Sequence, residues 1–63
     1  MRSWLIIGKA SANYPRIINR LTGTAIGIGS NATFKADAEG AIMVKGCANE
    51  IELAWFRGFC AAL

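Results

Sequence analysis

The chain has 63 residues and a net charge of +3, with no histidine and only four carboxylate side chains, those of Asp37, Glu39, Glu50 and Glu52. Such a chain lacks most of the groups used in acid–base catalysis and in metal binding, so we expect no enzymatic activity, no metal site and no cofactor. All four acids lie in the second half, whereas the first 36 residues carry Arg2, Lys9, Arg16, Arg20 and Lys35.

A chain of this length forms one small domain, residues 1–63, and buries only about 60% of the surface that its unfolded form exposes. Yet 54% of its residues are hydrophobic, which is more apolar material than one small core hides. The two cysteines, Cys47 and Cys60, could supply one disulfide at most. We therefore expect part of the apolar surface to be covered by a larger protein partner or, in a homo-oligomer, by a second copy of the chain.

The first residues begin like a secretory signal, with an early arginine and an apolar run at Trp4–Ile7. That run is far shorter than the core of a signal peptide, and Gly8 and Lys9 interrupt it. No stretch of the chain is long and apolar enough to span a membrane. We therefore expect a cytoplasmic protein whose thiols are reduced and act as small buried apolar groups.

The first third of the chain predicts a strand followed by a helix. Ser3–Ile7 is rich in β-formers, and both of its alternating sets are apolar, which favours a central strand. Ser11 can cap a helix, and Pro15 then falls in the first turn, where its missing N–H costs little. An apolar stripe follows at helical spacing, and Gly23 is placed to end the helix. The stripe consists of Tyr14, Ile17, Ile18 and Leu21.

Residues 24–46 favour β-structure with turns. Thr24–Ile28 is β-prone but is interrupted by glycine, and Thr33–Ala36 is a short extended run. The pattern leaves open whether residues 24–36 form one bent strand or two. Asp37–Gly40 is the clearest turn, and Ala41–Lys45 completes a hairpin.

The last segment predicts a second helix, from Asn49 through Leu63. Asn49 and Glu52 are spaced like a capping box, and Gly58 would mark a close approach of the helix to the sheet. One helical face collects Ile51, Trp55, Gly58, Phe59 and Ala62, and its apolar arc continues through Leu53, Phe56 and Cys60. The arc spans about 200°, roughly twice the stripe that one core needs, which predicts a second contact surface.

The order of these elements predicts a small α+β sandwich of β-α-β-β-α type. In that architecture an antiparallel-rich sheet carries both helices on one face.

Two glycine-containing segments resemble nucleotide-binding motifs without satisfying them. Residues 8–11 (GKAS) are similar to a phosphate loop, but Ser3 stands where a glycine is required and Ala10 separates lysine from serine. We keep a weaker hypothesis, an anion site formed by Lys9 and Ser11 at the start of the first helix. Residues 27–32 (GIGSNA) fit a loose dinucleotide pattern, but no helix follows, so we interpret them as a glycine-rich strand or bulge.

The sequence has no recognisable family resemblance, so function is inferred from its surfaces. The first hypothesis is a non-catalytic protein–protein interaction module, a small inhibitor or adaptor that occupies a surface of a larger partner. A phage or mobile-element accessory protein is the origin that we expect for such a module. Aromatic and arginine side chains dominate interface energies, so they are the expected anchors and rim. The predicted partner-binding residues are Leu53, Trp55, Phe56, Phe59, Arg57, Arg16 and Arg20.

The second hypothesis is a small basic protein that binds nucleic acid or another polyanion through the first helix. Arg16, Arg20 and Lys9, together with Lys35, would contact phosphates, while Tyr14 and Phe34 would stack on bases. A third class, a membrane-active cationic peptide, is disfavoured by the scattered glycines and turn residues.

Overall fold

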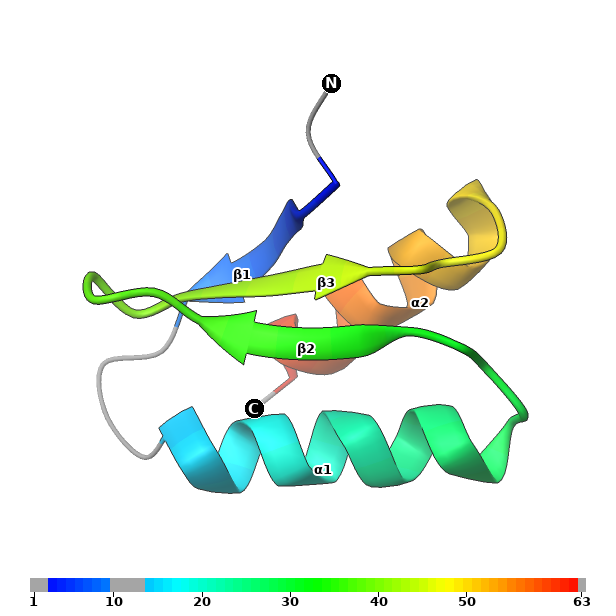
Figure 1. Cartoon of the computed structure of the whole chain (residues 1–63), viewed down its shortest axis with the longest axis horizontal. Coiled ribbons are helices and arrows are strands. Elements are labelled where there is room, and N and C mark those ends of the chain that lie inside the picture. Colours follow the sequence, from blue (N-terminus) through cyan, green and yellow to red (C-terminus); the bar gives the residue numbers. More distant parts are fainter. Residues whose placement is uncertain (1–2, 10–13, 63) are drawn as a thin grey trace.

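The computed structural model describes residues 3–9 and 14–62, which form three strands and two helices. The elements are β1 (Leu5–Lys9), α1 (Tyr14–Gly27), β2 (Thr33–Ala36), β3 (Ala41–Lys45) and α2 (Glu50–Ala61). The strands form one antiparallel sheet in the order β1-β3-β2, with α1 packed against β2 and α2 against β1 (Figure 1). The predicted β-α-β-β-α order and α+β class are confirmed.

One core joins both helices to the same face of the sheet. Leu21 and Ala25 of α1 and Phe56 of α2 are buried together with Ile42 and Val44 of β3. Ile42 and Val44 are two residues apart on one strand, so their side chains share a face. The helices therefore form one layer and the sheet forms the other, and within residues 3–9 and 14–62 the opposite face of the sheet carries no helix.

The first strand differs from the prediction. It runs from Leu5 to Lys9 and lies at an edge of the sheet, whereas β3 is central. The pairing of β1 with β3 shifts between Ile6 and Gly8, where the strand bulges. Ile7 is buried, but Ile6 is 55% exposed, so the two apolar sets do not reflect burial on both faces.

The first helix extends beyond Gly23, contrary to the prediction of β-structure from residue 24. The spacing from Leu21 to Ala25 continues the buried stripe by one turn, and this burial outweighs the β-propensity of Thr24 and Ile26. The Thr24 hydroxyl donates a hydrogen bond of 2.9 Å to the carbonyl of Arg20, a bond typical of threonine within a helix.

The helix ends instead at Gly27, and its C-terminus is capped by Gly29, which has a φ of 73°. The N–H of Ser30 donates to the carbonyl of Ala25 at 2.8 Å, and that of Gly29 to Ile26 at 3.1 Å, which together form a Schellman motif. Residues 27–32 are thus a helix terminus and loop, and the predicted glycine-rich strand or bulge is not formed.

The hairpin of β2 and β3 forms where it was predicted. The Asp37 carboxylate accepts hydrogen bonds of 2.9 Å from the N–H groups of Glu39 and Ala41, and Gly40 has a φ of 84°. These local contacts close the turn and set the register, in which Phe34 pairs with Val44 and Lys35 with Met43. Residues 24–36 therefore contribute a helical turn and one strand.

The second helix begins at the predicted cap. The side chain of Asn49 accepts a 2.9 Å hydrogen bond from the N–H of Glu52, while the Glu52 carboxylate accepts from the N–H of Ala48 at 3.3 Å. Leu63, the predicted last residue, lies outside the described residues. The predicted close approach at Gly58 is wrong, since a Cβ there would meet nothing within 4 Å. The close approach is at Gly8, where an added Cβ would lie 2.7 Å from the Cβ of Cys60.

Candidate docking surface

The second helix turns a narrow apolar stripe toward the sheet. Phe56 is fully buried, and its ring meets that of Phe34 edge-on, with the centroids 5.0 Å apart and the planes at 78°. Leu53 and Cys60, three residues before and four after Phe56, are half-buried against the same core, as is Phe59. The core thus uses only part of the apolar arc of this helix.

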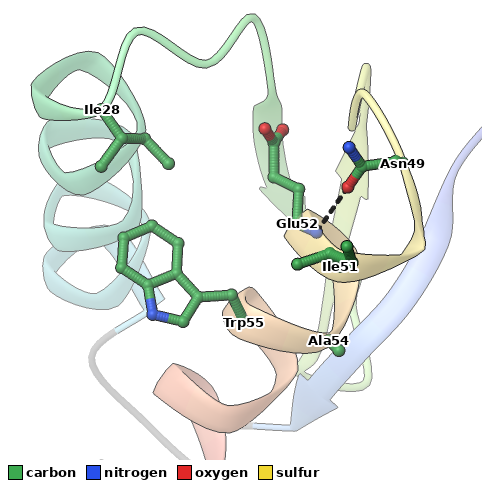
Figure 2. A pocket seen from close by; sticks show the side chains of 6 residues that line it. All are labelled: Ile28, Asn49, Ile51, Glu52, Ala54 and Trp55. Atoms are coloured by element: carbon green, nitrogen blue, oxygen red, sulfur yellow. Dashed lines mark hydrogen bonds between the residues drawn. The ribbon is translucent and has the colours of Figure 1, made fainter.

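The rest of the apolar arc of α2 faces solvent. Ile51 and Trp55 lie one helical turn apart and are 81% and 51% exposed. At the end of α1, Ile26 is 72% exposed and Ile28 is 47% exposed. Figure 2 shows the Trp55 ring projecting from α2 toward α1, with Ile28 above it. Ile51 and Trp55 of α2 therefore gather with Ile28, which follows α1, where the end of α1 faces the start of α2.

We call this surface the Trp55 groove. It is a shallow, open depression of about 560 Å³, lined by Ile28, Asn49, Ile51, Glu52, Ala54 and Trp55. Its two polar members are both engaged in local structure, Asn49 as the cap of α2 and Glu52 through its carboxylate. The lining therefore offers mainly apolar contact, and its one carboxylate, that of Glu52, is already hydrogen-bonded within the protein.

A hydrogen bond between the two sides of the groove holds its shape. The Ser30 hydroxyl, in the loop after α1, donates to the Glu52 carboxylate at 2.6 Å. The same hydroxyl accepts from the N–H of Ala32 at 3.1 Å. Charge-assisted bonds of this kind are among the stronger ones in proteins. The contact fixes the start of α2 beside the chain that leaves α1.

The structure separates the predicted aromatic anchors. Trp55 lines the groove, but Phe56 belongs to the core, so a partner cannot contact its ring and it is removed from the candidate residues. The 100° step of a helix explains the difference, since residue 56 lies within about 60° of residues 53 and 60 around the helix, whereas residue 55 lies about 100° away from residue 56 on the other side. Leu53 and Phe59 are half-buried against the core and leave only part of their surface for a partner.

The predicted arginine rim is dispersed rather than gathered at the groove. Arg16, Arg20 and Arg57 are exposed. The Arg57 guanidinium donates to the carbonyl of Ile6 on the edge strand at 3.2 and 3.4 Å, and that of Arg20 lies 5.9 Å from the ring centroid of Phe59. None of the three lines the groove.

The structure does not bring together the two residues of the predicted anion site. Lys9 is exposed at the end of β1, while Ser11 lies outside the described residues. Within those residues no group of three or more His, Cys, Asp and Glu side chains is placed to hold a metal ion.

Ile28 and Ile51 are the groove residues that the list of predicted anchors omitted. The helical spacing does place Ile51 on the same face as Trp55, but aromatic and arginine side chains, which dominate interface energies, are the anchors that this face predicts. Ile28 was hidden by the prediction of β-structure for residues 24–28. Extending the Leu21–Ala25 spacing by one more turn would have placed residue 28 at the end of a helix.

Both thiols are free and partly buried. Burial raises the pKa of the Cys60 thiol. Burial also raises the pKa of Cys47, as does the nearby Glu52 carboxylate, against a smaller opposing effect of Arg57. A raised pKa disfavours the thiolate, so neither cysteine has the environment of a nucleophile.

Neither helix, over the part of the chain that is described, combines the length and apolar character needed to cross a bilayer. Comparison with protein-family models, curated proteins and solved structures finds no match to this chain, so its function is argued from its own surfaces.

Proposed function

We propose that the protein is a non-catalytic interaction module that binds a larger protein through the Trp55 groove. The observation that carries this proposal is the exposure of Ile51 and Trp55, at 81% and 51%, beside Ile28. Burying an apolar side chain of this size contributes about 1.5–3 kcal/mol, so covering the groove provides a substantial driving force for association. Tryptophan is also among the residues most often found at energetic centres of interfaces.

The partner segment that fits best is an amphipathic helix. The groove runs between two helical segments, and its α2 side presents Ile51 and Trp55 one turn apart, as in complexes where a helix lies in an apolar groove. Glu50 and Glu52 lie in the first turn of α2, at one end of the surface. We therefore expect the partner helix to carry lysine or arginine beside its apolar face at that end.

The test begins with a tagged pull-down from native lysate, repeated after nuclease treatment and at high salt, and continues with the purified partner. Titration calorimetry would then compare wild type with Trp55→Ala and Ile51→Ser. We expect each substitution to weaken binding about 10-fold or more. Ile6→Ser is the matched control, because Ile6 is 55% exposed but lies on the sheet.

Two results would count against this proposal. One is equal loss of affinity in the Ile6 control and the groove variants. The other is sedimentation of the isolated protein as a stable dimer that Trp55→Ala dissociates, which would make a second copy the occupant of the groove.

An inhibitor or adaptor role, an origin in a phage or mobile element, and a cytoplasmic location are proposals that identification of the partner would decide. The hypothesis of polyanion binding through the first helix has less support, because Lys35 lies on the sheet and Arg20 packs over Phe59.

A further inference from the structure

The face of the sheet that carries no helix has its own chemistry. The antiparallel register aligns Ile6, Met43 and Lys35 in one row across the three strands. Ile42 and Val44, the neighbours of Met43 in β3, are buried against the helices, so this row faces the other way. Lys45 and Lys9, both exposed, share this face by the same alternation. We call this surface the open face.

Trp4 lies on the open face, and the ammonium groups of two lysines are close to its ring. The Nζ atom of Lys35 is 4.4 Å from the centroid of the Trp4 ring, and that of Lys45 is 5.1 Å away. Each distance is within cation–π range. Among residues 3–9 and 14–62 neither ammonium group forms an ion pair with a carboxylate. Two unneutralised positive charges are therefore held beside one aromatic ring.

The acidic side chains offset only part of this charge. Glu50 and Glu52 belong to α2, in the other layer, and Glu39 lies in the turn between β2 and β3. Asp37 is the acid beside the open face, and its carboxylate already accepts two backbone N–H groups in the turn. Bringing a phosphate between Lys35 and Lys45 would relieve their mutual repulsion, which favours an anionic ligand.

The open face also has room for a flat apolar group. A shallow depression of about 390 Å³ is lined by Ser3, Trp4, Ile6, Asp37 and Met43. Aromatic stacking next to a track of basic side chains is the combination used for single strands of nucleic acid, since each nucleotide supplies one phosphate and one π-face. An acidic peptide would satisfy the lysines but would leave the apolar depression without a matching group.

We propose that the open face binds single-stranded nucleic acid. Lys35 and Lys45 contact backbone phosphates, Lys9 extends the basic track along β1, and a base stacks at Trp4 against Ile6 and Met43. This site lies on the sheet: it shares Lys9 and Lys35 with the surface that the sequence predicts, but it does not include Arg16 and Arg20 of the first helix. It is also separate from the Trp55 groove in the helical layer.

The experiment is a fluorescence-anisotropy titration of labelled oligodeoxycytidine and oligodeoxythymidine at salt concentrations from 50 to 200 mM. Wild type is expected to bind both, with an affinity that falls as salt rises. Lys35→Gln combined with Lys45→Gln should weaken binding at least about 10-fold and reduce the slope of log affinity against log salt by about 1.4. Trp4→Ala should weaken binding about 10-fold, and Trp4→Phe should restore most of it.

The matched control is Arg16→Gln combined with Arg20→Gln, which removes the same charge from the helical layer and is expected to leave the affinity nearly unchanged. Circular dichroism of every variant separates loss of binding from loss of fold, and the exposed lysines can be replaced without affecting the core. Trp55→Ala should bind the oligonucleotides as wild type does, so this result is independent of the proposed protein partner.

Three outcomes would overturn the inference. The first is no binding at 50 mM salt. The second is an equal effect of the arginine control and the lysine variant, which would return the site to the first helix. The third is equal binding of polyglutamate with no effect of Trp4→Ala, which would show a surface that recognises charge without bases.

Discussion

Phe56 and Trp55 are neighbours in the chain with opposite surroundings, and a comparison of the two tests the core directly. Phe56 is fully buried, whereas Trp55 is half-exposed. Truncating a buried phenylalanine costs about 3–5 kcal/mol. A domain of this size has a total stability of about 3–9 kcal/mol. Phe56→Ala is therefore expected to leave much of the chain unfolded, as measured by urea titration with circular dichroism.

Trp55→Ala is the control for that measurement. Its side chain contacts Phe56, with the ring centroids 5.8 Å apart, but half of its surface is already in water. We expect its loss of stability to be well below that of Phe56→Ala. Equal losses in the two variants would mean that Trp55 supports the core, and the groove would then lose its principal anchor.

The two thiols give a prediction about reactivity. Burial raises the pKa of both Cys47 and Cys60, so the thiolate, which is the reactive form, is scarcer than in the unfolded chain. We expect slower reaction with Ellman's reagent at pH 8 in buffer than in urea. A burst of reaction from the folded protein, matching the unfolded rate, would contradict this.

The same pKa direction fixes the sign of the pH dependence of stability. A pKa raised on folding means that the folded protein binds more protons than the unfolded chain once pH exceeds the ordinary thiol pKa. The contribution is fully present below that pH and is lost as pH rises through the folded value. Replacement of both cysteines by serine should therefore flatten the alkaline limb of a plot of the unfolding free energy against pH.

At the scale of elements, a substitution at Gly23 tests whether α1 continues past that residue. Gly23 lies within the helix, its φ is not positive, and an added Cβ would meet nothing within 4 Å. Gly23→Ala is therefore expected to stabilise the protein by about 0.5–1 kcal/mol in urea unfolding. Had the helix ended at Gly23 in a left-handed conformation, the same change would destabilise it.

Gly46 supplies the opposite case for the same measurement. Its φ is 90°, and a Cβ there would lie 2.8 Å from the carbonyl oxygen of Asn31. Both the backbone conformation and the close contact penalise a side chain, so Gly46→Ala is expected to destabilise the fold. Stabilisation by this substitution would be inconsistent with the path of the chain between β3 and α2.

The elements that could be predicted from the sequence are those set by local contacts. The hairpin turn depends on Asp37 and Gly40, and the start of α2 depends on Asn49, all of which act within a few residues. The end of α1 could not be obtained this way, because Thr24 and Ile26 favour strands and only burial of Ala25 keeps the chain helical. The edge position of β1 depends on pairing across the whole chain.

The sequence indicates that the second helix carries a second contact surface, but it does not indicate which residues form that surface. The wide apolar arc of the second helix did indicate a second contact surface, and Trp55 does face solvent. Periodicity alone could not say which side of the arc faces the sheet, since both sides are apolar. The position of Phe56 against Phe34 settles that choice, and it requires contacts between residues far apart in sequence.

At the scale of the whole molecule, the open face and the Trp55 groove differ in how readily they associate with other copies of the chain. The open face carries Lys9, Lys35 and Lys45, so two such faces repel one another. The groove has exposed Ile51 and Trp55 with no comparable cluster of like charge in its lining. Non-specific association of the free protein is therefore expected to occur through the groove rather than through the sheet.

Because the groove residues lie outside the core, substitutions there should change solubility without changing stability. Because Ile51 and Trp55 contribute surface that the core does not use, replacing both by serine should raise the concentration at which the protein precipitates. The free energy of unfolding, measured by urea titration, should change by less than about 1 kcal/mol. Ile6→Ser removes a comparably exposed side chain from the lysine-bearing face and should raise solubility less. If the double variant gains no solubility, or unfolds as readily as Phe56→Ala, these residues are part of the packed structure and the groove is not a free surface.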